Sequence, residues 1–391
     1  MTFRGLSKYS HLDVQVFESA AKFREQGAGI LLQTTATWVL ELMGLKQCLI
    51  DAGAVPLNPT RTMIGTGPDS GKFLFEVGQG ERPSYNVHRS ALLEQIYKGI
   101  DGSRMHAGKK LTKLEKAGEE IQLHFEDGTT HVCDVVLGAD GIRSKTRAFV
   151  VPADDPAANP VFTGLWSIWQ MAPTEKAVEC LGSELINVKD PRQYGWAGDG
   201  GFLMHDLMSD NKMAQYIVSF RVEGEDPADV KDWKRTVTQE QLRKILAGWE
   251  PPLEKGMFDI IAYNETKSKE PTTAISIWHQ WAVPKISEGC IALVGDAAGA
   301  TSPWQASGSG MALQDAFLLS GLFAHVTTAK EANAALKAYN SVNRPIREGI
   351  IRSSYETVRS FTDRIQRWAW ILMLSLGTSS ISGSGFMALM C

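Results

Sequence analysis

The sequence has few cysteines and no paired-cysteine motif. Its five cysteines are odd in number and none forms a C-x-x-C pair, which argues against a disulfide framework and against a zinc site. An excess of one charge is also missing, because 40 Lys and Arg residues stand against 44 Asp and Glu residues, giving a formal net charge of −4. This balance excludes a broadly basic nucleic-acid binder, so we expect no nucleic-acid partner.

Long hydrophobic runs are missing as well. The most apolar stretch near the end, Trp368 to Leu376, is much shorter than the roughly 20 residues that a membrane-spanning helix needs. We therefore expect a buried or surface-docking helix there and no clear membrane span. No signal-peptide pattern opens the chain, and the unpaired cysteines fit a reducing, cytoplasmic location. Hydrophobic residues make up 43% of the chain, which is typical of a globular protein and not of a disordered one.

The order of secondary-structure signals predicts an α/β protein with a β-rich insertion. Strand patterns occur at 13–17, 121–125 and 132–137, and helical patterns occur at about 35–45 and from residue 90. From about residue 151 strand-like runs take over, at 161–171, 183–188, 202–205 and 213–222. A buried strand at 291–294 and two long helical stretches, about 308–326 and 330–361, follow. This order implies a first domain built from discontinuous segments.

Two segments carry signals for ligand binding, and the first is weak when taken alone. Glu18 closes a strand, where a dinucleotide fold places a carboxylate that accepts hydrogen bonds from ribose hydroxyls; a solvated Glu after a strand is the alternative. A buried strand also ends in Gly138-Ala139-Asp140-Gly141, where glycine lets the backbone approach a ligand closely. Arg143 then offers a guanidinium for phosphate or carboxylate. The alternative, a strand followed by a tight turn, does not account for the whole run from Asp134 to Ser144.

The strongest signal is the segment from Gly295 to Gly310. A strand delivers Asp296 to its carboxyl end, and a glycine-rich loop then opens a long helix that includes Ser309. Small residues let such a loop wrap around a ligand, and the N-terminus of the helix favours negative charge. The segment therefore predicts a site for a phosphate-containing ligand.

Taken in this order and spacing, these segments resemble those of the FAD-dependent aromatic hydroxylases, which are single-component flavoprotein monooxygenases of the salicylate hydroxylase type. The likeness is nearest to fungal members that serve secondary metabolism, and it covers about residues 10–360. It implies a Rossmann-like FAD-binding domain at 1–150 and 285–328, a β-rich substrate domain at 151–284, and C-terminal helices at 329–391.

The resemblance also implies roles for individual residues. Cofactor-binding residues would be Glu18, Gly29, Arg89, Asp140, Arg143, Asp296 and Ser309, with Asp140 and Arg143 bridging the FAD and nicotinamide sites. Gln170 and His205 are the catalytic, substrate-side candidates, and for His205 a structural role is equally open. No metal site is expected. Arg344-Pro345 would match a structural Arg-Pro pair of the family.

Three features depart from the family pattern. The G-x-G-x-x-G fingerprint should precede the acidic residue by about 20 residues, so for Glu18 it would fall at or before Met1. We therefore expect the first strand and most of the first helix to be absent from this sequence. Gly299 stands where the family usually carries His. Trp169-Gln170 stands where many relatives carry Tyr-Arg, and Gln170 can offer only neutral hydrogen bonds to a substrate.

As the family implies, NADPH or NADH would reduce FAD, and O2 would then supply the oxygen that hydroxylates an aromatic, enolic or polyketide-like small molecule. Two alternatives remain: a truncated, non-catalytic remnant that does not retain FAD, and a reductase or dehydrogenase on the same fold. The sequence gives no sign of the oligomeric state.

Overall fold

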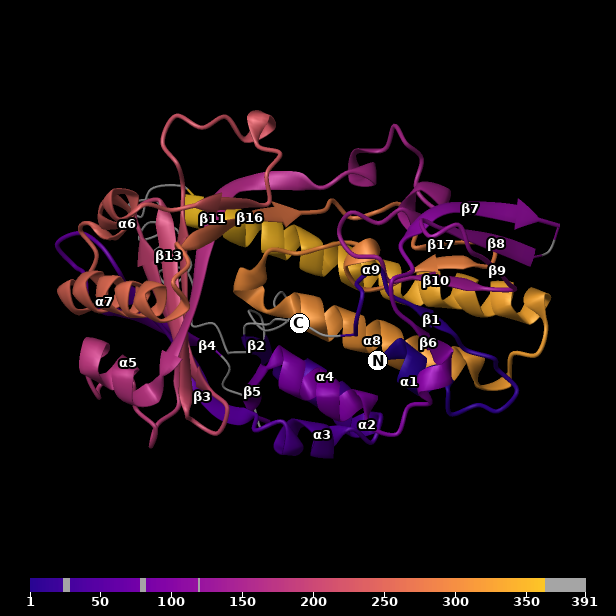
Figure 1. The fold of residues 1–391 in the computed structure, drawn as a ribbon, viewed down its shortest axis with the longest axis horizontal. Helices are drawn as coiled ribbons and strands as arrows, with labels where there is room; N and C mark the ends of the chain where they lie inside the picture. The colour runs from indigo at the N-terminus through magenta and orange to yellow at the C-terminus, as the bar shows by residue number, and fades with distance from the viewer. Residues whose placement is uncertain (24–28, 78–81, 119, 363–391) are drawn as a thin grey trace, which may run out of the picture.

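The computed structural model describes residues 1–23, 29–77, 82–118 and 120–362, and the statements below refer to these. Figure 1 shows a large sheet with helices on its outer face, next to smaller sheets and two helices from the C-terminal part of the chain. The fold is therefore the mixed α/β type that the sequence predicts.

The large sheet contains ten strands in the order β15-β16-β11-β14-β13-β12-β3-β5-β2, with β4 paired to β3. These strands are β2 (Gly29–Leu32), β3 (Val55–Ile64), β4 (Phe73–Val77), β5 (Ser84–His88), β11 (Val161–Pro173), β12 (Arg192–Gly198), β13 (Gly201–Met208), β14 (Met213–Phe220), β15 (Lys234–Thr236) and β16 (Thr273–His279). Only β12 and β3 pair in parallel. The sheet crosses the predicted domain boundary at residue 150, because strands from the first segment continue those of the β-rich segment.

Alternation along the central strands gives the sheet two faces. On the outer face, Trp166, Leu203 and Tyr216 pack in one buried cluster with three helices. These helices are α5 (Thr174–Leu181), α6 (Gln239–Leu246) and α7 (Pro251–Ser268). Because side chains on a strand alternate, their neighbours in the sequence point to the opposite face.

The opposite face turns toward the C-terminal helices. Leu165 and Ile277 of the sheet pack against Val358 of α9 (Ala329–Thr362). Figure 1 shows α9 and α8 (Ser307–Leu322) on this side of the sheet, away from α5, α6 and α7. We call this the inner face. The two helices confirm the two long helical stretches predicted at 308–326 and 330–361.

Parallel pairing of dinucleotide-fold type occurs in two further sheets. β10 (Val136–Gly138) pairs in parallel with β18 (Ile291–Leu293), which also pairs with β17 (Ser287–Glu288). β1 (Val16–Phe17) pairs in parallel with β6 (Met105–His106). Among the described strands none joins β1 to β10, so each of the two has one edge without a partner strand.

A three-stranded antiparallel sheet shows that the strand predicted at 132–137 is wrong. It consists of β7 (Leu111–Ala117), β8 (Glu120–Phe125) and β9 (Thr130–Cys133), and Gly128 makes the predicted turn with φ +82°. The single return strand expected at 132–137 is instead two strands. β9 pairs with β8, whereas β10 pairs with β18, because the chain changes sheets between them.

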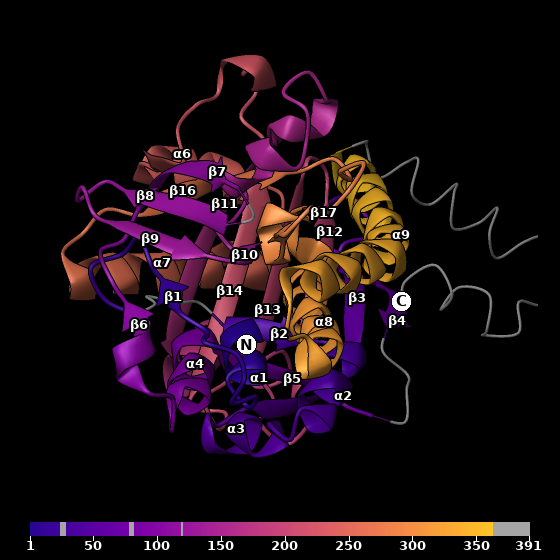
Figure 2. The ribbon, with the colours of Figure 1, turned by 90° about the vertical axis from the view of Figure 1, so that its right-hand side faces the viewer.

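Of the remaining helices, the first two pack on α8, and the other two pack against each other, as Figure 2 shows from the side. They are α1 (Thr2–Leu6), α2 (Thr34–Leu42), α3 (Lys46–Asp51) and α4 (Arg89–Tyr97). Gly5 lets α1 approach α8 closely, because a Cβ at this position would lie 2.8 Å from Ser320 Oγ. The helical patterns expected near residues 35 and 90 are thus confirmed.

The strand predicted at 183–188 is wrong. Residues 183–188 form turns, because Gly182 ends α5 with φ +86°, and the strand of this region is β12.

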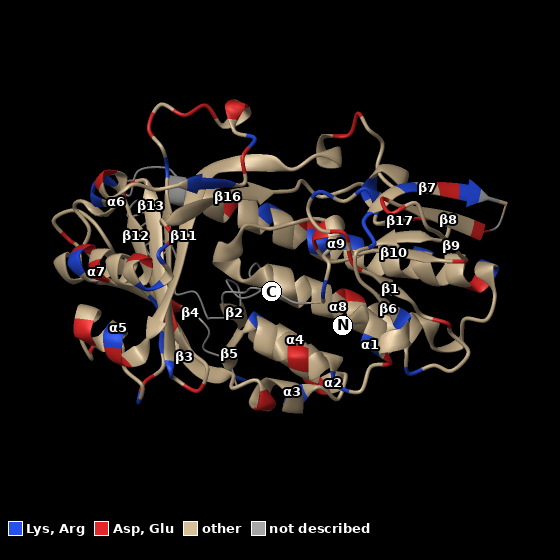
Figure 3. Ribbon diagram, viewed as in Figure 1, with Lys and Arg blue, Asp and Glu red and all other residues tan. Residues whose placement is uncertain are grey.

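Within the described residues, no helix has the length and apolarity for crossing a membrane, and no cluster of three or more His, Cys, Asp or Glu could hold a metal. Trp368 to Leu376 lies outside the described residues. Figure 3 shows both charge signs intermixed over the outer helices.

Candidate functional site

The predicted glycine-rich loop runs from β18 into α8. Gly295 (φ +57°) and Gly299 (φ +144°) take backbone conformations that side chains rarely adopt, and Ala306 (φ +49°) precedes the first residue of α8. The loop therefore makes sharp turns that expose the N-terminus of α8, as a phosphate-binding loop requires.

A buried ion pair between the two long helices holds this loop. Arg347 Nη2 of α9 lies 2.5 Å from Asp315 Oδ2 of α8, and the two side chains are 2% and 0% exposed. The Gly295 N–H donates to the same Asp315 oxygen at 2.6 Å, and Arg347 Nη1 donates to the carbonyls of Gly295 (3.1 Å) and Gly299 (3.3 Å). These bonds fix the course of the loop from the side of the two long helices.

A second buried arginine holds the loop from the Asp140 segment. Arg147 is 2% exposed, and it donates from Nε to the Ala297 carbonyl (2.9 Å) and from Nη2 to the Asp296 carbonyl (3.1 Å). Its Nη1 bonds the Ile142 carbonyl at 2.8 Å. Sequence reasoning missed Arg147, as well as the Asp315–Arg347 pair. The available signal was an Arg in a glycine-ended strand segment, but only the fold brings it to the loop.

Asp296 lies where the loop leaves β18. Its side chain is exposed to solvent, although crowding by protein atoms raises the pKa of its carboxyl, against the opposing effect of Arg347, Arg89 and Arg147. A Cβ on Gly308 would lie 3.9 Å from Asp296 Oδ1, so glycine leaves open space between this carboxylate and the start of α8. A carboxylate, the exposed guanidinium of Arg89 and a helix N-terminus form a donor and acceptor set that fits the sugar and phosphate groups of a dinucleotide.

Most of the other predicted cofactor residues lie on the elements around this loop. Arg89 begins α4 and is exposed, and its charge acts on Asp296. Ser309 lies in the first turn of α8. Gly29 begins β2 and pairs with His88, directly before Arg89. The structure thus brings Asp296, Arg89 and Ser309 to one end of α8.

Three further predicted residues contact neighbouring groups of the chain. Asp140 caps its own turn, because its carboxylate accepts from the N–H groups of Lys145 (2.7 Å) and Thr146 (3.0 Å). The guanidinium of Arg143 stacks over the ring of Trp233 at 4.3 Å. Glu18 accepts from the N–H of Ala20 at 2.8 Å and so closes the turn after β1.

The inner face of the large sheet is aromatic and apolar. Strand register places Trp169, Ile217 and Met204 in one row across β11, β14 and β13, with Phe202 in the next row. Gly195 of β12 makes room for the Phe202 ring, because a Cβ there would lie 2.9 Å from its Cζ. On strands β11 to β14, Asp206 is the one charged residue of the inner face.

The two substrate-side candidates lie on the outer face instead. His205 is 1% exposed and stacks on Tyr194 at 5.0 Å, next to Tyr216. Burial lowers the pKa of His205 to about 3. The side chain of Gln170 accepts a hydrogen bond from Asn264 of α7. Both side chains therefore point toward the outer helices and away from α8 and α9.

A hollow of about 380 Å³ lies at the other end of α8, away from the loop. It is lined by Lys8, Tyr9, Met43 and Phe317, among others, between α1, α2 and α8. None of the predicted site residues lines this hollow.

Comparison with known proteins identifies the family. A family model described as FAD binding domain matches residues 100–354, about two thirds of the chain. The chain is 31% identical to 6-methylsalicylate 1-monooxygenase of Aspergillus terreus, over 93% of this chain and 82% of that protein. It is 28% identical to a salicylate hydroxylase of Pseudomonas putida, over 90% of this chain and 81% of that protein.

Solved structures show the same fold. A salicylate hydroxylase substrate complex superposes with a TM-score of 0.75 at 20% identity, covering 100% of this chain and 89% of that chain. HpxO of Klebsiella pneumoniae, complexed with FAD and uric acid, gives a TM-score of 0.76 at 19% identity, covering 96% and 89% of the two chains. Together with the loop at Asp296, these matches show that the chain belongs to the FAD-dependent aromatic hydroxylases of the salicylate hydroxylase type, and FAD is its cofactor.

Proposed function

We propose that this flavoprotein uses NADH or NADPH and O2 to hydroxylate a small aromatic or enolic molecule, in a secondary-metabolite pathway. The proposal rests on one observation: the Asp296 loop lies at α8 and α9, and an aromatic, apolar face of the large sheet turns toward the same two helices. A flat, electron-rich ring fits such a face, since aromatic groups bind by burial and by stacking. The relatives named for salicylate and 6-methylsalicylate support an aromatic substrate.

The chain's own residues hold the cofactor in this proposal. Asp296 accepts from hydroxyl groups of the ribityl chain, and the N-terminus of α8 with Ser309 receives the pyrophosphate. Arg89 adds a guanidinium toward the flavin or its phosphates, and Glu18 binds the adenosine ribose. Arg143, exposed on Trp233, is the candidate contact for the nicotinamide nucleotide. Bound FAD supplies electron transfer from the nicotinamide and the activation of O2.

The inner face supplies the substrate wall. Trp169 and Met204 are half-buried there, while Ile217 is buried between them. No Lys or Arg of β11 to β14 points to this face, so these strands offer a substrate carboxylate no ion pair. We therefore assign ring binding to apolar contacts and expect the wall to accept neutral phenols as readily as acidic ones.

The test is an activity screen of the FAD-loaded protein. NADH and NADPH oxidation is measured with salicylate, 6-methylsalicylate and the corresponding phenols without the carboxyl group, and products are analysed by mass after incubation with isotope-labelled O2. Incorporation of one labelled oxygen into an aromatic product supports the proposal. Nicotinamide oxidation with no label in any product would instead identify a reductase or dehydrogenase.

Two neighbouring residues provide a matched pair for the substrate wall. Trp169→Leu removes an aromatic surface from the inner face and should raise KM about tenfold or more, which corresponds to about 1.4 kcal/mol of lost contact. Gln170→Leu changes the outer face and should leave KM within about twofold. Equal effects of the two substitutions would contradict this placement of the substrate.

A further inference from the structure

A buried polar cluster lies between the central strands of the large sheet and its edge strand β2, which begins at Gly29, one of the residues that the family resemblance assigns to FAD binding. Asp206 of β13 is 2% exposed, and its neighbours Asn86, Gln193 and Gln215 are buried as well. Asn86 Nδ2 lies 2.6 Å from Asp206 Oδ1, Gln193 Nε2 lies 2.8 Å from Oδ2, and Gln215 Nε2 lies 3.4 Å from Oδ1. Four strands, β5, β12, β13 and β14, thus meet at one carboxyl whose hydrogen-bond partners are neutral amides.

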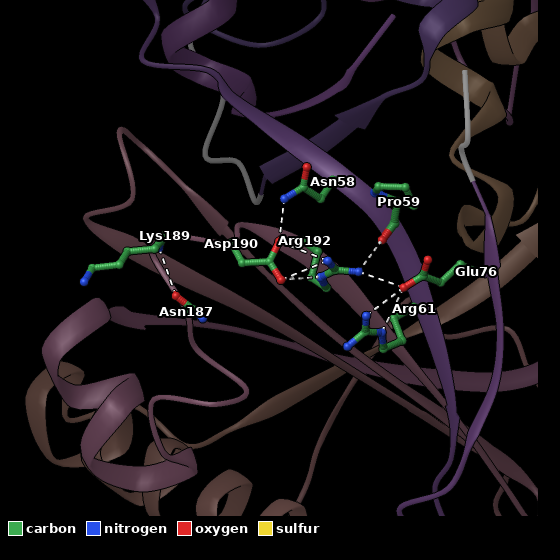
Figure 4. A network of polar contacts seen from close by, with 8 residues as sticks. All are labelled: Asn58, Pro59, Arg61, Glu76, Asn187, Lys189, Asp190 and Arg192. Atoms are coloured by element: carbon green, nitrogen blue, oxygen red, sulfur yellow. Dashed lines mark hydrogen bonds and ion pairs between the residues drawn. The ribbon is translucent and has the colours of Figure 1, made fainter. Parts of the chain in front are cut away.

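The charged and titratable groups of the surrounding strands face elsewhere. His205 and Tyr216 point to the outer face, and His88 of β5 hydrogen-bonds to a neighbouring serine at 2.8 Å. Arg192 of β12 is held by two acidic side chains at the sheet edge (Figure 4). Without a cation, a buried carboxylate is costly, and burial accordingly raises the pKa of Asp206 to about 7.

The geometry of the amides leaves two acceptors unsatisfied. Asn86 Nδ2 also donates to the Leu207 carbonyl at 2.9 Å, which fixes the orientation of this amide, because a backbone carbonyl only accepts. Asn86 Oδ1 and Gln215 Oε1 are both buried and accept no hydrogen bond. Each lies 3.1 Å from the position that a Cβ of Gly29 would occupy. Two orphaned acceptors at one place are unfavourable unless a donor is available.

We propose that Asp206 is protonated in the folded protein, that it donates this proton to the Gln215 carbonyl oxygen, and that it thereby positions the FAD-binding segment at Gly29. The donation requires Gln215 to turn its amide by half a rotation, which exchanges Oε1 and Nε2 and leaves the shape of the side chain unchanged. The turned Gln215 presents its Nε2 donor on the side where Asn86 Oδ1 lies. In this proposal the proton gives the Gln215 oxygen a donor, and the turned amide directs its own donor toward Asn86 Oδ1.

This arrangement makes Asp206 a positioning residue. Its carboxyl acts through Gln215 and Asn86, and Asn86 belongs to β5, which pairs directly with the Gly29 strand β2. The Met208 methyl and the two amides fill the space beside Gly29, so a shift of the cluster moves the backbone that leads into Leu31 and Gln33. The proposal concerns cofactor binding and is independent of the identity of the substrate.

The protonation state is tested on the FAD-free protein by infrared difference spectroscopy. The spectrum of the natural chain minus that of Asp206→Asn should show the carbonyl-stretch band of a protonated carboxylic acid at pH 6. Labelling aspartate at its carboxyl carbon should shift this band, and raising the pH should reduce it to half near pH 7. Absence of the band at pH 6 means that Asp206 is ionised and overturns the proposal.

The positioning role is tested by FAD titration of variants at pH 6. Asp206→Asn keeps a neutral group of the same shape, so its FAD Kd should stay within about threefold of the natural value. Asp206→Ala should weaken FAD binding about tenfold or more, since the two amides lose their shared partner. If this variant does not fold, Gln215→Met breaks the same link while Asp206 keeps Asn86 and Gln193.

Ser219→Ala is the matched control. Ser219 lies on the same strand, β14, and the same face as Gln215, but it hydrogen-bonds to Ser167 at 2.7 Å, outside the cluster. It should leave the FAD Kd within about threefold. Two outcomes overturn the positioning role: an unchanged Kd in both Asp206→Ala and Gln215→Met, or a loss in Asp206→Asn as large as in Asp206→Ala. The second outcome would mean that the charge of Asp206 matters and that its proton does not.

Discussion

Replacing Arg347 by Met tests how the cofactor loop is held. Met keeps the length and apolar character of the side chain but removes the guanidinium that lies 2.5 Å from Asp315. The Asp315 side chain is fully buried, and it keeps the Gly295 N–H (2.6 Å) and the Tyr339 hydroxyl (2.8 Å) as donors. Its charge, however, loses its counter-ion.

The expected loss follows from this burial. Removing one partner of a buried ion pair typically costs about 3–5 kcal/mol, because the other charge is left uncompensated. The loop carbonyls of Gly295 and Gly299 lose their common donor as well. We therefore expect Arg347→Met to lower the free energy of unfolding by about 3–5 kcal/mol. Adding Asp315→Leu should restore part of this loss, since no buried charge then remains.

The assay is urea unfolding of the FAD-free protein, followed by FAD titration of the folded variants. Arg344→Met is the control: Arg344 lies on the same helix, forms an i,i+4 pair with Glu348 at 3.1 Å, and is about one third exposed. Its loss should cost less than about 1 kcal/mol. The reasoning fails if Arg347→Met costs no more than this control, or if the double variant is less stable than Arg347→Met alone.

Three further predictions concern the same elements. Burial holds the pKa of His205 near 3, so the folded chain does not bind a proton that the unfolded chain binds below about pH 6.5, and the free energy of unfolding falls as the pH is lowered. His205→Phe should therefore reduce the loss of unfolding free energy between pH 7 and pH 5 by about 2 kcal/mol, as measured by urea unfolding. An unchanged loss would contradict the burial argument. Gly299→His should lower the unfolding temperature, because φ is +144° and a Cβ would lie 2.5 Å from Ile351 Cδ1; an unchanged temperature would refute this conflict. A segment fused before Met1 that supplies a strand and G-x-G-x-x-G should raise FAD content and stability, since β1 and β10 each have a free edge among the described strands; equal FAD content in both forms would count against it.

The large-scale order of the fold was accessible from the sequence because local patterns carry it. The Asp127-Gly128 turn, the long C-terminal helices and the strand before Gly295 all follow from residues within a few positions of one another. The path of residues 132–137 was not accessible in this way. Both halves are strand-like, and only long-range pairing assigns one half to β8 and the other to β18. The same holds for the parallel pair β12 and β3, whose partners are more than 100 residues apart.

The cofactor loop was predictable for a similar reason, since its glycines and Asp296 form one continuous motif. Its supports were not. Arg147, Asp315 and Arg347 come from three distant segments, and each would pass as an ordinary helix or turn residue in the sequence. Their role appears only when the fold places a guanidinium behind each group of loop carbonyls.

The substrate wall shows why side-chain orientation was the hardest part to predict. A strand covered on one face alternates between apolar and polar residues, and this alternation tells which side chains point inward. β14 is buried along nearly its whole length, so both of its faces are covered and the alternation is lost. A shift by one residue then exchanges the two faces: His205 and Gln170 point to the outer helices, whereas Asp206 and Trp169 point inward. On β13 the residue to which we assign a role is therefore not His205, whose imidazole lies between aromatic rings, but its neighbour Asp206, whose proposed proton acts through Gln215 on the Gly29 strand.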